Sequence, residues 1–219
     1  MGAKVEGESN PVNLIDTMIG RADRLLRTMA GPVSAQRPSP AKDLAPAHLD
    51  DDARRHAAGL MRVNHTGEVC AQALYEGQAL VAKAAHVRRA LRHAAAEEED
   101  HLSWCEERLR ELHARPSVLN PLFYATSFAM GAVTGLLGDR VSLGFVHATE
   151  DRVVAHLEDH ERTLPEDDHR SRAIIEQMRV DEAEHGEAAL DLGGTPFPAP
   201  IRALMATSSK LMTETTYRL

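Results

Sequence analysis

Cysteines, aromatic residues and strand-like patterns are scarce in this sequence. Cys70 and Cys105 are the only cysteines among 219 residues, and they form no Cys-x-x-Cys pair. A disulfide framework and a thiolate zinc site are therefore disfavoured. Aromatic residues make up 4% of the chain, and no segment sustains alternation between apolar and polar residues. Because alanine and leucine are abundant instead, we expect an all-α protein.

Positive charge and an N-terminal apolar segment are also lacking. The net charge is −8 and no basic stripe with aromatic residues occurs, which argues against a nucleic-acid binder. The first ten residues, MGAKVEGESN, contain no apolar signal-peptide core, and Glu6 stands where the myristoylation pattern needs Ser or Thr. We therefore expect a reducing, cytoplasmic setting.

Apolar residues at helical spacing divide the chain into two regions. Residues 1–49 are expected to hold an amphipathic helix at 12–30 and a proline-rich linker from Gly31. Residues 50–219 are expected to form a helical bundle. Its helices should break near Ala85 and at Pro165, and a last amphipathic helix should cover 201–212.

Residues 116–138 contain no charged side chain, and about 20 apolar residues suffice to cross a bilayer. Asn120, Pro121 and several hydroxyl residues dilute this segment. A buried helix, a membrane span and an interfacial segment that enters one leaflet are the three interpretations. We favour the interfacial one, which makes the protein peripheral to the cell membrane on its cytoplasmic side.

The pattern Glu-x-x-His occurs three times. Glu166 and His169 lie in a polar run after a proline and fit a solvated helix start. The other two pairs lie within apolar stripes, where an uncompensated charge costs several kcal/mol. Upstream of each pair, a single glutamate also lies on an apolar helix face. The six residues singled out in this way are Glu68, Glu98, His101, Glu150, Glu182 and His185.

This doubled pattern is typical of ferritin-like di-iron and di-manganese bundles, in which two helices give one Glu and two give Glu-x-x-His. Four carboxylates would balance two divalent ions, whereas without metal some would have to take up protons. Carboxylates with imidazoles suit iron or manganese. We therefore predict a site for two iron ions.

Several nearby residues leave alternatives open. Glu97 and Asp181, each four residues before a histidine, could replace the predicted ligand glutamates. His65 is expected to orient a carboxylate and His147 is left undecided. His156 is expected to be a surface or pocket residue. Tyr75 and Cys105 are expected to belong to the core, with a redox role for either as the alternative.

Four segments closely resemble the bacterial demethoxyubiquinone hydroxylases, the di-iron monooxygenases of ubiquinone synthesis. They are LMRVNHTGEVCAQALYEGQAL, AEEEDHLSWCEERL, GDRVSLGFVHATE and SRAIIEQMRVDEAEHGEAAL, and the resemblance runs from about Val12 to the C-terminus. The metal ligands of that family fall on the same six residues. Thr66 and Gly186 replace an expected alanine beside ligands, and neither puts a ligand in doubt.

The resemblance implies hydroxylation of 2-polyprenyl-3-methyl-6-methoxy-1,4-benzoquinone at its free ring carbon with O2. It also implies contact with membrane lipid at one leaflet and an electron donor that the sequence does not identify. Other ubiquinone-biosynthesis proteins are candidate partners. Because a fold does not fix a function, a ferritin-like ferroxidase and a non-enzymatic scaffold remain as alternatives.

Overall fold

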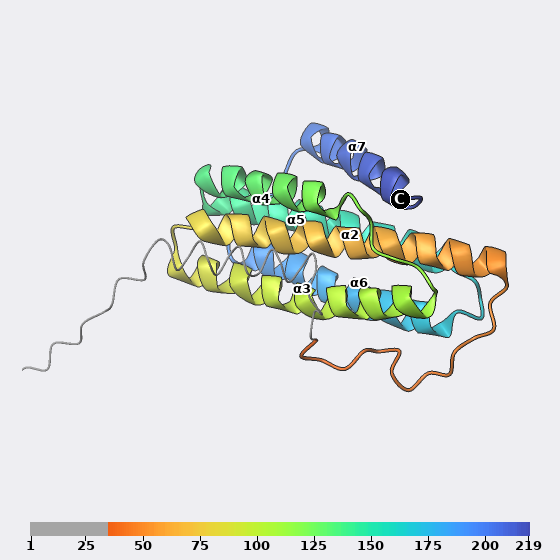
Figure 1. The fold of residues 1–219 in the computed structure, drawn as a ribbon. Helices are drawn as coiled ribbons and strands as arrows, with labels where there is room; N and C mark the ends of the chain where they lie inside the picture. The colour runs from red at the N-terminus through yellow and green to blue at the C-terminus, as the bar shows by residue number, and fades with distance from the viewer. Residues whose placement is uncertain (1–34) are drawn as a thin grey trace, which may run out of the picture. The chain divides into compact units, whose positions relative to one another are not determined.

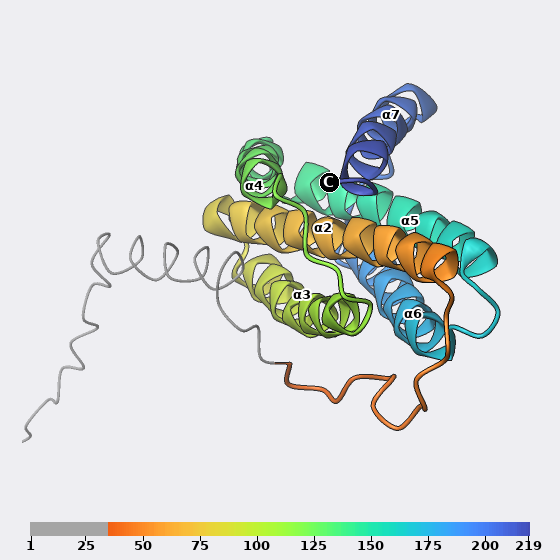
Figure 2. The same cartoon turned by 45° about the vertical axis from the view of Figure 1, so that its right-hand side comes forward.

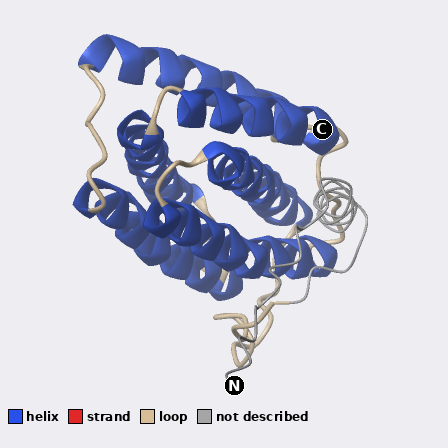
Figure 3. Cartoon of the chain, turned by 90° about the vertical axis from the view of Figure 1, so that its left-hand side faces the viewer, coloured by secondary structure: helices blue, strands red, loops and turns tan. Residues whose placement is uncertain are grey.

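The computed structural model describes residues 35–219, and every regular element in this part of the chain is a helix (Figures 1 and 3). The expected all-α class is confirmed for these residues. The amphipathic helix expected at 12–30 lies outside them. The helices are α2 (Asp51–Val81), α3 (Ala85–Glu111), α4 (Asn120–Leu136), α5 (Asp139–Thr163), α6 (His169–Asp191) and α7 (Ala199–Thr216).

Four of the helices form a bundle of two hairpins. α2 packs against α3, and α5 packs against α6. Contacts between α3 and α6 and between α2 and α5 join the hairpins. α4 lies along α2 outside the bundle, and α7 crosses the ends of α2 and α5 on the same side as α4 (Figures 1 and 2).

The helix ends follow from local sequence signals. The Asp50 carboxylate accepts a hydrogen bond of 2.8 Å from the Ala53 N–H and caps α2. Asp168, after the break at Pro165, caps α6 through the Ser171 N–H at 3.0 Å. Gly138 separates α4 from α5 with a φ of 119°, a conformation that favours glycine. The predicted breaks near Ala85 and at Pro165 are thus confirmed, since no helix covers 82–84 or 164–168.

Two apolar clusters fill the bundle, and a polar layer separates them. One cluster includes Met61, Trp104 and Ile175, and the other includes Tyr75 and Leu143. Along each bundle helix the chain passes from one cluster to the other. The residues between the clusters are the glutamates and histidines predicted to bind metal.

α4 approaches α2 closely because a glycine on each helix faces the backbone of the other helix. A Cβ on Gly131 would lie 2.2 Å from the Leu74 carbonyl oxygen, and a Cβ on Gly77 would lie 2.2 Å from that of Phe128. The opposite side of α4 exposes large apolar side chains. Among residues 35–219, no helix is both long enough and apolar enough to cross a bilayer. The span interpretation of 116–138 therefore finds no support.

Candidate metal centre

Each bundle helix places one glutamate near its middle, on its inward face. Glu68 on α2, Glu98 on α3, Glu150 on α5 and Glu182 on α6 are between 0% and 2% exposed. Each sits in an apolar stripe, so burial of the stripe carries the carboxylate inward with it. The bundle therefore brings together four acids from distant parts of the sequence.

The two histidines complete the layer. The His101 side chain is fully buried, and that of His185 is 10% exposed. Because each lies three residues after a glutamate on the same helix face, its Nδ1 turns toward the acids. All six predicted residues thus lie in one layer, and ligand atoms of Glu68, Glu98, His101 and Glu182 lie within 4.8 Å of one another.

Two carboxylates reach both histidines. Glu98 lies 3.1 Å from His101 Nδ1 through Oε2 and 3.4 Å from His185 Nδ1 through Oε1. Glu182 lies 3.1 Å from His101 Nδ1 through Oε1 and 3.2 Å from His185 Nδ1 through Oε2. Each of the two therefore turns one oxygen to each imidazole, as a carboxylate that bridges two ions does.

The other two glutamates lie at opposite ends of the layer. Glu68 Oε2 is 3.6 Å from His101 Nδ1. Glu150 lies on the His185 side, where its Oε1 accepts a hydrogen bond of 2.6 Å from the Tyr75 hydroxyl. The layer therefore has two halves, each with one histidine and one glutamate of its own.

Burial and mutual repulsion disturb the ionisation of the layer. Burial, reinforced by the Glu98 charge, raises the pKa of Glu68 well above its ordinary value. Burial, reinforced by Glu182 and Glu98, does the same to the pKa of Glu150. Burial thus favours the protonated forms of Glu68 and Glu150, and a bound cation would displace those protons.

The pKa values of both imidazoles are raised. Burial opposes their charge, but hydrogen bonds to Glu182 and Glu98 outweigh it and raise the pKa of His185 to about 12. Bonds to Asp181 and to the carboxylates likewise raise the pKa of His101. For Glu98, burial is outweighed by hydrogen bonds from both histidines, which lower its pKa.

The donor set fits a metal with hard oxygen ligands. Glu150 Oε2 is buried and makes no hydrogen bond. Unsatisfied buried oxygens cost free energy, which a bound cation would recover. Carboxylates combined with imidazoles suit iron or manganese better than a structural zinc ion. The cluster could therefore hold a metal, and the ferritin-like bundle suggests iron.

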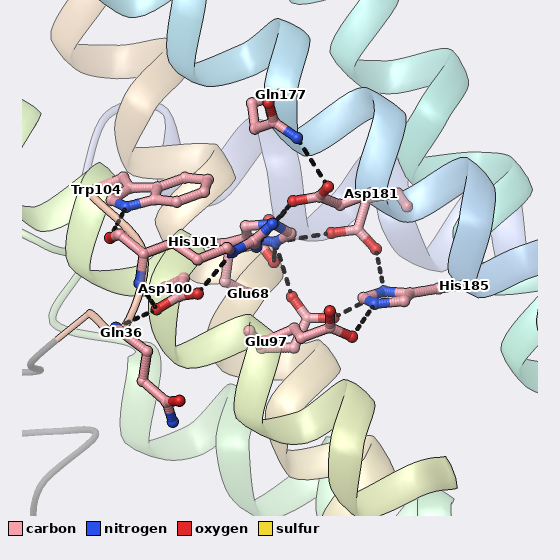
Figure 4. Close-up of polar contacts among 12 residues, drawn as sticks. Gln36, Glu68, Glu97, Asp100, His101, Trp104, Gln177, Asp181 and His185 are labelled. Carbon is pink, nitrogen blue, oxygen red and sulfur yellow. Dashed lines mark hydrogen bonds and ion pairs between the residues drawn. The ribbon is translucent and has the colours of Figure 1, made fainter. Parts of the chain in front are cut away.

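Glu97 and Asp181 lie behind the histidines rather than among the clustered acids. His101 Nε2 donates to Asp181 Oδ2 at 2.9 Å, and His185 Nε2 donates to Glu97 Oε2 at 3.0 Å (Figure 4). The partners are crossed, since each acid belongs to the helix that carries the other histidine. In the sequence an acid directly precedes the glutamate in both pairs, but this pattern does not specify whether that acid binds a metal or the opposite histidine.

The remaining candidates take varied places. The Asn120 amide donates to His65 Nδ1 at 3.2 Å, so His65 joins α2 to α4 instead of orienting a carboxylate. His147 Nδ1 donates to the Gly186 carbonyl at 3.2 Å and joins α5 to α6. Three other expectations are confirmed: Tyr75 and Cys105 belong to the core, and His156 lines a cavity.

Two residues near the layer have no periodic signal in the sequence. Arg37, in the expected linker, contacts Asp181 and Asp100. Asp100 lies among polar residues directly before His101, so the sequence suggests an exposed acid. In the structure its exposure is only 3%. The third Glu-x-x-His pair behaves as expected, because Glu166 and His169 are exposed at the start of α6.

Two cavities reach the layer. The larger, of about 390 Å³, is lined mainly by apolar side chains and touches Tyr75 and His185. The smaller, of about 40 Å³, touches Glu68 and lies beside Met212 and Thr213 of α7. The larger cavity has room for a small aromatic ring.

Comparison with known proteins gives consistent matches along the chain. The family model of the ubiquinone biosynthesis protein COQ7 matches residues 55–216. A 3-demethoxyubiquinol 3-hydroxylase of Pseudomonas putida (strain GB-1) is 56% identical over 207 residues, which cover 94% of this chain and 96% of that protein. Proteins of the same name from Azotobacter vinelandii and Ectopseudomonas mendocina are 57% and 58% identical, over 93% and 94% of this chain and 95% and 96% of their own lengths. The family resemblance expected from the four segments is confirmed.

Among solved structures, a dodecameric thioferritin, the bacterioferritin-related protein of Bacteroides fragilis, has a similar fold. The TM-score is 0.53 at 18% identity, covering 63% of this chain and 84% of that one. At this identity the likeness concerns the fold alone. It confirms the expected ferritin-like helical bundle.

Proposed function

Because the chain belongs to the COQ7 family of ubiquinone biosynthesis proteins, we propose that it is a di-iron 3-demethoxyubiquinol 3-hydroxylase. It would hydroxylate the free ring carbon of the polyprenyl quinol, the reduced form of the benzoquinone expected above. One oxygen atom of O2 would enter the ring, and the other would leave as water with two electrons and two protons from a donor. The family and its relatives support the reaction, and the buried layer supports the cofactor.

The proposed ligands of two iron ions are Glu68, Glu98, His101, Glu150, Glu182 and His185. The observation that carries the count of two is the placement of Glu98 and Glu182, each of which turns one oxygen to each histidine. A single ion would leave one imidazole, and the glutamate that belongs to the same half of the layer, without a metal to bind. Two divalent ions would balance the four carboxylates and neutral imidazoles.

The side chains of this layer would hold and orient the reactants. Bound iron would supply oxygen activation, which no amino-acid side chain provides. Glu98 and Glu182 would help to hold both ions, and the Tyr75 hydroxyl would hold the Glu150 carboxylate in place. The apolar clusters on both sides would exclude water, so that oxidation is directed to the quinol.

Isotope labelling tests the reaction. Iron-loaded protein in detergent is supplied with demethoxyubiquinol, a reductant and heavy oxygen gas, and mass spectrometry follows the product. We expect one heavy oxygen atom in the ring. Oxidation of ferrous iron with the quinol unchanged would contradict the proposal and favour a ferroxidase.

Matched variants test the ligands and exclude a scaffold role. Glu182→Ala should abolish both iron binding and hydroxylation, whereas Glu166→Ala removes the glutamate of the exposed Glu-x-x-His pair and should change neither. Cells that depend on this protein for quinone should make no product when they carry the Glu182→Ala variant. Full product from Glu182→Ala would mean that the protein acts as a scaffold.

We also propose that α4 and α7 dock the protein peripherally on the cell membrane, in one leaflet. Exposed apolar side chains occupy both helices, and both lie on the same side of the bundle (Figures 1 and 2). A polyprenyl substrate stays in the bilayer, so its enzyme needs such a surface. The residues are Leu122, Met130, Val133, Leu136, Ile201, Leu204 and Leu211, which are 43% to 67% exposed.

Liposome sedimentation tests this docking surface. Leu122→Asp together with Val133→Asp should release the protein from vesicles, because each buried charge opposes insertion. Val180→Asp changes an exposed apolar residue of α6, away from α4, and should leave binding intact. Equal binding of the two variants would refute the docking surface.

A further inference from the structure

Residues 35–44, here called the strap, connect α3 and α6 from outside the bundle. The Gln36 N–H donates to Asp100 Oδ1 on α3 at 2.6 Å, and the Leu44 carbonyl accepts a bond of 2.6 Å from Arg170 on α6. Between these anchors Ala41 is 1% exposed and packs into the cluster that contains Trp104. The strap is therefore fixed at two points, of which only one adjoins the metal centre.

At that point the Arg37 side chain contacts four groups, and one of them is the His101 ring itself, whose Nε2 lies 3.5 Å from Arg37 Nη2. Its Nε donates to Asp100 Oδ2 at 2.7 Å, and its Nη2 lies 2.9 Å from Asp181 Oδ2. Its guanidinium carbon lies 4.9 Å from the ring centroid of Trp104. This planar fork joins one acid of α3 to one acid of α6 in a fixed geometry that a lysine ammonium does not reproduce.

Asp181 is held on both of its oxygens. Oδ2 faces both Arg37 and the His101 Nε2–H, each at 2.9 Å, and Oδ1 accepts a bond of 2.9 Å from Gln177 (Figure 4). These donors fix the carboxylate plane and its charge. The carboxylate in turn fixes the His101 ring, so that Nδ1 faces the glutamates.

His185 is held in a different way. Its acceptor Glu97 is 35% exposed and is shared with His93, whose side chain is 77% exposed. Among residues 35–219, the acid that holds His101 is therefore the one that an arginine contacts. The strap makes the two halves of the layer unequal.

We propose that Arg37 is a positioning residue for the metal centre: from the strap it orients Asp181 and, through Asp181, the His101 imidazole. This inference rests on the proposed function, because the orientation matters only if His101 binds metal. Loss of Arg37 would remove the one arginine among the three donors to Asp181, so that only Gln177 and the His101 imidazole would hold the carboxylate. The ligand field at His101 would change, although Arg37 touches no metal.

The test compares Arg37→Gln and Arg37→Lys with Arg170→Gln as the matched control. Arg170→Gln removes the other arginine anchor of the strap and touches no residue of the layer. Anaerobic calorimetry with Co²⁺ gives affinities, and the visible Co²⁺ spectrum reports ligand geometry. We expect about a tenfold loss of affinity and a shifted spectrum in Arg37→Gln, at the lower end of what loss of a ligand's hydrogen-bonding partner costs.

Arg37→Lys keeps the charge and should also shift the spectrum, because an ammonium does not reproduce the fixed planar fork that aligns Asp181. Arg37→Lys takes the place of Arg37→Gln in the test if circular dichroism shows that Arg37→Gln is unfolded. The inference is overturned if the folded Arg37 variants bind Co²⁺ as the wild type does, or if Arg170→Gln loses as much affinity. If the wild type itself binds no Co²⁺, Fe²⁺ or Mn²⁺, the proposed function falls together with the inference.

Discussion

Between pH 6.5 and 8.5, the metal-free protein should lose stability, whereas the metal-loaded protein should not. The pKa of His185 rises from an ordinary 6.5 to about 12 in the folded protein, because bonds to Glu182 and Glu98 outweigh burial. A raised histidine pKa stabilises the fold fully below the unfolded value, and this contribution declines as pH rises toward the folded value. Over these two pH units His185 alone accounts for about 2 kcal/mol.

Other groups with shifted pKa values either lower the stability of the metal-free protein between pH 6.5 and 8.5 as well, or affect it outside this pH range. The raised pKa values of His101, Glu68 and Glu150 also make folding less favourable as protons are lost. The opposite effect comes from histidines whose pKa burial lowers, such as His65 at about 4. That effect is confined to pH values below about 6.5, where the unfolded chain takes up protons.

Metal reverses the sign because ligands must lose their protons to bind it. Binding strengthens as pH rises, and it adds about 2.7 kcal/mol at a free metal concentration of 100 times Kd. For a chain of this size, each kcal/mol shifts Tm by roughly 2–4 °C. The gap between metal-free and metal-loaded protein should therefore widen from pH 6.5 to 8.5.

Urea unfolding across this pH range measures how the unfolding free energy changes with pH. A chelator gives the slope of the metal-free protein, and anaerobic Fe²⁺ or Mn²⁺ gives that of the metal-loaded protein. His185→Gln should flatten the metal-free slope by about 2 kcal/mol across the window, while His169→Gln, at an exposed position, should keep it. A metal-free stability that stays constant or rises from pH 6.5 to 8.5 would refute the reasoning. It would mean that the acids and imidazoles do not share protons in this geometry.

Three further substitutions test the packing around the site. Gly131→Ala places a Cβ 2.2 Å from a backbone oxygen of α2 and should cost about 1–3 kcal/mol of unfolding free energy, measured in urea. Arg108→Met leaves the fully buried Asp168 carboxylate without its 2.7 Å ion pair, so about 3–5 kcal/mol should be lost; an unchanged Tm would contradict this. Tyr75→Phe removes the hydrogen bond to Glu150 and should weaken one of two Mn²⁺ binding steps about tenfold in calorimetry, with the other step unchanged.

Periodicity alone was sufficient to predict the layer. Glu68, Glu98, Glu150 and Glu182 recur within apolar stripes, and a helix has no other way to bury such a stripe than to bury the acid with it. The helix ends were predictable for the same local reason, because Asp50 and proline breaks mark them in sequence. These features depend on residues within one or two helical turns of each other.

The sequence could not predict which acids the histidines contact on the side that faces away from the clustered glutamates. Whether Asp181 binds metal or an imidazole depends on how α6 is rotated against α3, which a helical period does not specify. Arg37 lies in a segment without periodicity, and its partner Asp100 is separated from it by 63 residues. Such contacts are set by the tertiary arrangement, so only the structure reveals them.

The crossed acids also give the bundle a reason to adopt one register. His101 on α3 is held by Asp181 of α6, and His185 on α6 is held by Glu97 of α3. If α3 slid by one turn along α6, both imidazoles would lose their acceptors, and buried acids would lose their donors at the same time. Breaking a buried pair costs about 3–5 kcal/mol, whereas apolar side chains alone tolerate repacking at a smaller cost. The charged pairs behind the histidines therefore stabilise one alignment of α3 against α6 even in the metal-free bundle.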